Sequence, residues 1–175
     1  MPKASTDDSR LKARLSPRNA ILALLFAPDA KKDNSTWNWA APVEGKTRLV
    51  KELFLLTKET DSGPESLTFP FTPGPYGPSA IDLTNALDDM IRREEIGAST
   101  LPYGRAVVLR LVGKPGGEAR SLWASLEAGL RRDLYAVKSR FNDMGYKPLL
   151  RYVYRKYPAY TTNSLIREEI LSGSS

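Results

Sequence analysis

The proline-rich string at residues 70–78, with the sequence PFTPGPYGP, constrains this chain more than any other feature. Its four prolines lack an amide hydrogen and cannot donate a helical hydrogen bond. Each proline also disfavours the helical conformation in the residue before it. The string therefore predicts a rigid, extended connection, and a helical core has to be built from the segments before and after it.

Two helices are predicted before this connection. Ser16 followed by Pro17 is typical of an N-cap and a first helical position, and the apolar run at residues 19–27 then ends at Pro28. Residues 45–58 form the second helix, because leucines recur there at helical spacing. Those leucines are Leu49, Leu53 and Leu56. Residues 28–44 are predicted to be a loop.

A third helix and a β-hairpin are predicted after the connection. We expect Ser79 to cap the helix and Gly97 to end it. Residues 100–103 and 106–112 are expected to pair, since apolar residues alternate along the second segment. Three helices followed by a hairpin is the winged-helix order. The expected core comprises Leu49, Leu53, Leu83, Leu87, Leu109 and Leu111.

The remainder of the chain is predicted to be helical. Residues 118–144 carry leucines at helical spacing and are expected to form one long helix that stops at Gly145. Two shorter helices should follow. The predicted fold class is therefore mainly α with a small β-hairpin, a winged-helix-like core plus a C-terminal helical extension. The expected segments are a flexible one at 1–15, the core at 16–113 and the extension at 114–175.

The composition excludes several kinds of chemistry. The 175 residues contain no cysteine and no histidine, which removes disulfides, thiolate catalysis, Ser-His dyads and the usual transition-metal ligands. No apolar run approaches the roughly 20 residues that span a bilayer, and the polar N-terminus does not resemble a secretory signal. We therefore expect a cytoplasmic protein without a membrane partner, without a cofactor and without catalytic or metal-binding residues.

Positive charge is concentrated near the C-terminus. The chain has a formal net charge of +6, and residues 130–157 alone carry eight cations against Asp133 and Asp143. Tyrosines are interleaved with these cations, a pattern that favours nucleic-acid backbone as a partner, although a solvated helix face is an equal alternative. The predicted nucleic-acid-binding residues, which include two in the hairpin, are Arg105, Arg110, Arg131, Arg132, Lys138, Arg140, Lys147, Arg151, Arg155 and Lys156.

The third helix argues against ordinary sequence reading of DNA. It carries five acidic residues against Arg92 and Arg93, a net charge of −3. In a helix-turn-helix protein this helix enters the major groove, where phosphates would repel it. Adjacent Asp88 and Asp89 could indicate a hard-metal site, but their side chains diverge by about 100° on a helix, so a solvated acidic face is favoured.

Two smaller sets of residues complete the candidate sites. Lys46 and Arg48 crowd the start of the second helix, where the helix dipole disfavours cations, and are a candidate anion-binding pair. Trp37 and Trp39 in the 28–44 loop either latch onto the core or are exposed for a partner. With Tyr76 in the proline-rich string, they form the candidate partner-binding set.

Three strings in order resemble a known family. They are GKTRLVKELFLL at residues 45–56, FPF followed by PYGPS between residues 69 and 79, and LLRYVYRKYPAY at residues 149–160. Together they resemble the YwgA-type proteins and, more distantly, the Panacea or SocA-like antitoxin domains. The resemblance implies a winged-helix-like scaffold. It also implies a role in toxin neutralisation, proteolytic adaptor work or phage defence, and it brings no catalytic residues.

Several functions follow as hypotheses. The first is a non-catalytic winged-helix subunit of a prokaryotic defence or toxin–antitoxin assembly that contacts nucleic-acid backbone. The second is a protein-only antitoxin or adaptor that binds a co-encoded partner. A DNA-binding transcription regulator is a further alternative, and a carboxylate-dependent nuclease ranks last. The C-terminal helices are also a candidate surface for self-association.

Overall fold

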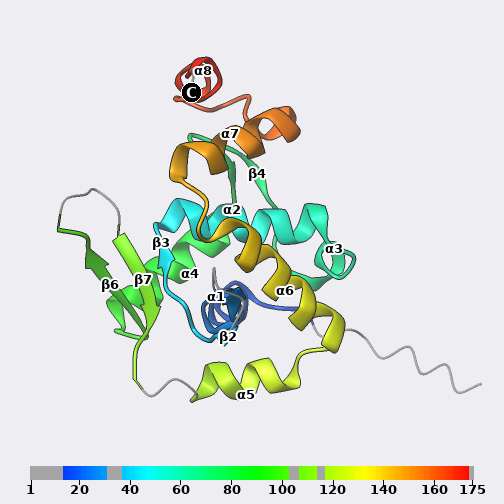
Figure 1. Cartoon of the computed structure of the whole chain (residues 1–175), viewed down its shortest axis with the longest axis vertical. Helices are drawn as coiled ribbons and strands as arrows, with labels where there is room; N and C mark the ends of the chain where they lie inside the picture. The colour runs from blue at the N-terminus through cyan, green and yellow to red at the C-terminus, as the bar shows by residue number, and fades with distance from the viewer. Residues whose placement is uncertain (1–13, 31–36, 103–106, 114–116, 174–175) are drawn as a thin grey trace, which may run out of the picture.

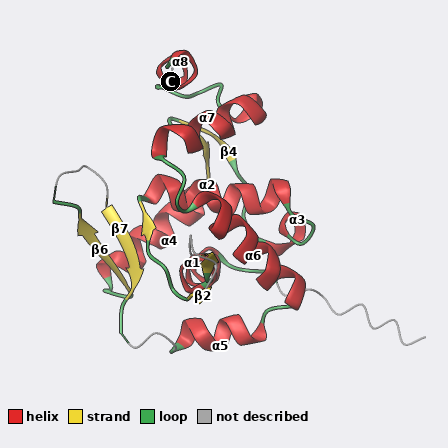
Figure 2. Ribbon diagram, viewed as in Figure 1, coloured by secondary structure: helices red, strands yellow, loops and turns green. Residues whose placement is uncertain are grey.

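The computed structural model describes residues 14–30, 37–102, 107–113 and 117–173. Helices make up most of the fold, and a small antiparallel sheet lies at one side of them (Figure 2). The predicted class, mainly α with a small β component, is confirmed. Arg105 and the proposed flexible segment up to residue 13 lie outside the described residues.

Helix α1 (Pro17–Phe26) occupies the centre of the molecule, with other helices around it (Figure 1). Ser16 caps it as predicted, its side chain accepting a hydrogen bond from the amide of Asn19. Every residue from Ala20 to Phe26 is buried, as expected for a helix that is apolar on all sides. The helix is therefore the hub on which the other elements pack.

The predicted loop at residues 28–44 contains short strands. Strands β1 (Asp29–Ala30) and β2 (Trp37–Asn38) pair with each other, and β3 (Val43–Glu44) pairs with a strand much later in the chain. The loop prediction is thus wrong at these positions. Two-residue strands carry no alternating pattern, so the sequence offers no signal for them.

Helix α2 (Lys46–Glu59) begins and ends within one residue of its predicted bounds. It is followed by the single-turn helix α3 (Gly63–Ser66). After α3, Leu67 forms an isolated β-bridge with Leu15.

The proline-rich string is extended, as predicted, and folds into a hairpin of β4 (Thr72–Gly74) and β5 (Gly77–Ser79). Tyr76 lies in the two-residue turn between them. Gly77 adopts a φ of +83°, and a β-carbon there would approach the ring of Tyr154 to 2.7 Å. Glycine is therefore required both by the turn and by packing.

Helix α4 (Ile81–Arg92) and the sheet differ from prediction at their boundaries. Ala80, not Ser79, is the N-cap residue, and no side chain caps the helix. The helix ends before Gly97, because Glu94 takes the left-handed conformation with a φ of 59° and turns the chain into β6 (Ile96–Thr100). Asn and Gly are the usual residues for such a turn, so Glu94 gave no signal.

Strand β6 pairs with β7 (Val107–Leu111), which confirms the hairpin although its first strand begins earlier than expected. Strand β3 joins the other side of β7, giving the antiparallel order β3-β7-β6. Five of the six predicted core leucines are fully buried, whereas Leu111 is only partly buried. Ile81, the first residue of α4, is 70% exposed.

The predicted long helix at 118–144 is two helices, α5 (Glu118–Ser125) and α6 (Ala128–Phe141). Leu126 and Glu127 between them have extended backbone. The break lets α5 pack against α1 while α6 crosses α2 and β1 (Figure 1). Sequence could not reveal it, because the leucine spacing continues unbroken through Leu122, Leu126, Leu130 and Leu134.

The chain then forms α7 (Tyr146–Lys156), a 3₁₀ turn η1 (Pro158–Tyr160) and α8 (Arg167–Ser172). Gly145, the predicted stop of the long helix, is instead the residue that precedes α7. One hydrophobic cluster runs from Leu15 to Ile170 and joins residues of the 16–113 and 114–175 segments. No helix within the described ranges is long and apolar enough to cross a membrane.

Candidate nucleic-acid interface

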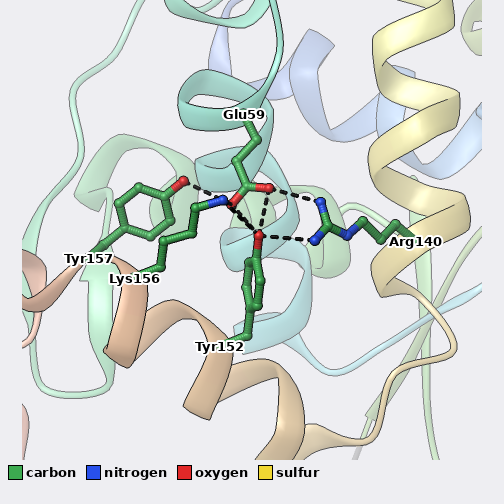
Figure 3. A network of polar contacts seen from close by, with 5 residues as sticks. All are labelled: Glu59, Arg140, Tyr152, Lys156 and Tyr157. Atoms are coloured by element: carbon green, nitrogen blue, oxygen red, sulfur yellow. Dashed lines mark hydrogen bonds and ion pairs between the residues drawn. The ribbon is translucent and has the colours of Figure 1, made fainter.

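Two cations of the predicted basic face converge on one carboxylate. Glu59, at the end of α2, accepts hydrogen bonds from Tyr152, Tyr157, Lys156 and Arg140 at 2.7–3.2 Å (Figure 3). These partners come from α6, α7 and the residue after α7. The side chain of Glu59 is only 9% exposed. The network connects helices α2, α6 and α7. Because Arg140 and Lys156 pair with Glu59, their charges are engaged by a contact inside the protein.

The electrostatics of this network favour its charged form. Desolvation alone would raise the pKa of Glu59, but the hydrogen bonds from Lys156, Tyr152 and Tyr157 hold it below the ordinary value. Desolvation and the neighbouring carboxylate raise the pKa of Tyr157 to about 12. Glu59 is therefore ionised and Tyr157 protonated at neutral pH, the states in which these hydrogen bonds form.

Lys138 is fully buried in the middle of the basic segment. Its Nζ donates to the carbonyl oxygens of Leu25 at 3.0 Å and Ala27 at 2.7 Å, at the C-terminal end of α1. A cation at this end satisfies carbonyls that have no helical partner and complements the helix dipole. Desolvation lowers the pKa of Lys138 to about 8. Its role is to cap the central helix.

Some of the other cations in the C-terminal region contact groups of the same chain, and others are exposed. Arg151 donates to the carbonyl oxygens of Ile170 and Gly173, and Lys147 lies 3.6 Å from Glu169. Arg155 and, on β7, Arg110 are exposed. Several cations of the predicted basic face therefore form hydrogen bonds or ion pairs within the protein.

The predicted anion-binding pair also forms internal contacts. Arg48 is 4% exposed and donates to the carbonyl oxygens of Phe141 at 2.6 Å and Glu44 at 3.1 Å. Lys46 forms an ion pair of 2.7 Å with Asp88. Arg48 therefore caps the end of α6 instead of facing solvent, which removes one of the two cations from the candidate site.

Sequence analysis missed a buried carboxylate. Glu52 on α2 is fully buried, and neither of its oxygens has a hydrogen-bond partner in the described structure. Desolvation raises its pKa to about 8, against the opposing influence of Lys138 and Arg48. A signal was present in the sequence, because Glu52 follows Leu49 by three positions and so falls on the apolar stripe.

A groove forms where α5, α6 and the segment around β2 meet. It has a volume of about 490 Å³, and its lining is mainly apolar. The lining residues are Pro28, Trp39, Trp123, Arg131, Arg132 and Tyr135. The indole of Trp39 lies 5.4 Å from the ring of Phe26 and 5.9 Å, edge-on, from that of Trp123.

This groove brings together residues that the sequence analysis had assigned to different sites. Trp39 came from the partner-binding set, and Arg131 and Arg132 from the nucleic-acid-binding set. Trp39 packs against Phe26 and Trp123 and is 50% exposed. The side chain of Arg132 is 70% exposed and lies 3.6 Å from Asp133. Trp123 and Tyr135 were not predicted as site residues.

Tyr76 is not part of the groove. It is 50% exposed at the tip of the β4–β5 hairpin, beside Leu165, whose amide donates to the carbonyl oxygen of Pro75. The predicted partner-binding set is therefore split between two places. The side chain of Trp37 lies outside the described part of the structure.

The acidic residues of α4 have partners of their own. Asp88 pairs with Lys46, and Asp89 forms ion pairs with Arg92 at 2.8 Å and Arg93 at 3.1 Å. Among the described residues, no three acidic side chains gather closely enough to hold a metal ion. Comparison with known proteins gives no match to a family profile and no similar curated protein.

Proposed function

We propose that the chain is a non-catalytic nucleic-acid-binding protein built on a winged-helix-like scaffold. The element order supports the scaffold: α1, β3, α2, α4 and then the β6–β7 hairpin, with β3 completing the sheet next to β7. In this interpretation α4 takes the position of a recognition helix and β6–β7 that of the wing.

The charge of α4 supports binding elsewhere on the surface. Asp82 and Asp88 are both exposed on α4, and Asp88 forms an ion pair with Lys46. Carboxylates repel phosphates, so sequence reading by this helix is disfavoured. The proposal therefore concerns binding that depends on the backbone and on charge.

The observation that carries the proposal is the groove with Arg131 and Arg132 on its border and Trp39 exposed in it. Both arginines lie in the N-terminal half of α6, and Arg132 lies 3.6 Å from the carboxylate of Asp133. Two cations beside this one carboxylate leave positive charge at the groove, which an anionic partner would neutralise. Arginine beside an exposed aromatic ring is the combination that nucleic-acid-binding surfaces use.

Fluorescence anisotropy with labelled single-stranded and duplex DNA tests the proposal. We expect binding at about 50 mM salt that weakens steeply toward 200 mM, because neutralised phosphates release counterions. Affinity should be the same for unrelated sequences of equal length. If neither the single strand nor the duplex binds at low salt, the proposal is contradicted.

The family resemblance implies a defence or toxin–antitoxin assembly as the setting. Binding of a co-encoded protein partner is therefore the second candidate function. It is favoured by the exposed apolar residues around the β4–β5 turn, where Tyr76 is 50% exposed and Leu165 is 79% exposed. Co-purification with co-encoded proteins tests it. A stable complex that Tyr76→Ala disrupts, without measurable DNA binding, would favour this adaptor function over the first proposal.

A further inference from the structure

The aromatic composition of the groove indicates the form of ligand that suits it. Trp39, which is 50% exposed, and the partly buried Tyr135 line the groove with aromatic rings, and Pro28 adds an apolar edge. The ring of Trp39 packs against Phe26 and the buried Trp123, and half of the residue is exposed. A flat, unsaturated group such as a nucleobase can stack on a surface of this kind.

The charges at the edge of the groove indicate what should accompany that flat group. Arg131 and Arg132 are consecutive on α6, and their guanidinium groups can donate paired hydrogen bonds to phosphate oxygens. The side chain of Arg132 is 70% exposed, so it can reach a group outside the groove. Adjacent aromatic and guanidinium groups match the alternation of base and phosphate along a strand.

Stacking in the groove requires a base whose face is accessible. In a duplex, each base is covered on both faces by its neighbours and is paired along its edge. Single strands and loops can turn a base outward onto an aromatic side chain. The acidic surface of α4 gives no compensating attraction for a duplex, since Asp82 and Asp88 are exposed there.

We propose that the groove of Trp39, Trp123, Tyr135, Arg131 and Arg132 binds single-stranded nucleic acid. An unpaired base stacks on Trp39, and the arginines contact the adjoining phosphates. This inference rests on the proposed function and makes it specific, because general backbone binding does not distinguish single strands from duplexes.

The first test compares two probes of the same length. Fluorescein-labelled oligothymidine of about 12 nucleotides and a duplex of equal length are titrated with the full chain at constant salt. We expect the single strand to bind at least about tenfold more tightly, the contribution of one well-stacked base. Equal or tighter binding of the duplex would overturn the inference while leaving the proposed function in place.

Variants of one aromatic residue then locate the site. Trp39→Ala should weaken binding of the single strand about tenfold, whereas Trp39→Phe should keep most of the affinity because a ring remains. Tyr146→Ala is the matched control, since Tyr146 is 46% exposed but lies outside the groove. Circular dichroism verifies that each variant is folded.

A double variant keeps the test decisive if Trp39→Ala does not fold. Arg131→Gln combined with Arg132→Gln leaves the rings in place and should also weaken single-strand binding at least about tenfold. Unchanged affinity in this variant, or in folded Trp39→Ala, would overturn the inference. So would displacement of oligothymidine by polyglutamate at an equal concentration of charges, because that would indicate an acidic peptide site. Failure of both DNA probes to bind would contradict the proposed function itself.

Discussion

The two ends of helix α6 use their positive charges differently. Near the C-terminal end, Lys138 is buried against the last carbonyls of α1, and Arg140 pairs with Glu59. Near the N-terminal end, Arg131 and Arg132 border a groove with an exposed tryptophan. Both ends contribute equally to the charge of the segment in the sequence. Their surroundings give the cations at the two ends different roles. Those near the C-terminal end stabilise the fold, and those near the N-terminal end lie at a surface groove.

This difference shows what a charge count leaves out. Residues 130–157 carry a formal charge of +6, as much as the whole chain, yet several of these cations are neutralised or buried by residues distant in sequence. Glu59 precedes its partner Arg140 by 81 positions. Whether a cation faces solvent is decided by such long-range contacts, and helical periodicity carries no information about them.

The largest expected effect is a difference in the free energy of unfolding between variants at the two ends of α6. Lys138→Ala should lower the free energy of unfolding by about 2–4 kcal/mol, since it leaves buried carbonyls without a donor and creates a void. Arg131→Ala makes the same charge change on the same helix and should cost less than about 0.5 kcal/mol. Urea unfolding measures both. Similar losses in the two variants would contradict the assignment of different roles.

Two buried residues of α2, Glu52 and Lys51, should make the stability of the protein depend on pH. The pKa of Glu52 is raised from 4.5 to about 8, so its contribution to stability is fully present below pH 4.5 and is lost as the pH rises through 8. The pKa of Lys51 is lowered by desolvation from 10.5 to about 7, so its contribution is present above pH 10.5 and is lost as the pH falls through 7. The pKa of Lys138 is lowered from 10.5 to about 8, so its contribution is likewise present above pH 10.5 and is lost as the pH falls through 8. Together these trends predict a minimum of stability between about pH 7 and 8.

Unfolding measured from pH 5 to pH 9 tests this minimum. The acid branch should fall by about 1.4 kcal/mol per pH unit where one proton separates the folded and unfolded states. Glu52→Gln should flatten the acid branch, and Lys51→Met should flatten the alkaline branch. Glu168→Gln is the control, because Glu168 is exposed on α8. An acid branch unaffected by Glu52→Gln would show that other groups cause it.

A smaller effect is expected at the network of Figure 3. Glu59→Gln removes the charge that accepts hydrogen bonds from Tyr152, Tyr157, Lys156 and Arg140, and should cost about 1–2 kcal/mol. Binding of oligothymidine, compared under conditions where the variant is folded, should not change. Weaker binding together with unchanged stability would place the network in the interface instead of the fold.

The fold could be predicted from the sequence where local rules determine it. Ser16 and Pro17 mark the start of α1, and the leucine spacing of α2 locates both its ends within one residue. The boundary errors arose where tertiary packing prevails over local pattern. The break at Leu126 and Glu127 is one case, and the left-handed turn at Glu94 is another.

The candidate site could be predicted only in parts. Trp39, Arg131 and Arg132 were all singled out, but they lie far apart in sequence, and nothing in the spacing joins them. Trp123 falls at a helical apolar position and therefore resembles any core residue. Conversely, Arg48 and Lys138 have the charge of binding residues and are instead buried caps of other helices.

The salt dependence of single-strand binding tests the division of roles along α6 most directly. For a single strand, each phosphate contact contributes about 0.7 to the slope of log affinity against log salt. We predict that Arg131→Gln combined with Arg132→Gln flattens this slope by about 1.4, whereas Arg140→Gln combined with Lys156→Gln leaves it unchanged. Equal flattening by the two double variants would contradict the account, because it would show that the whole basic face contacts the nucleic acid.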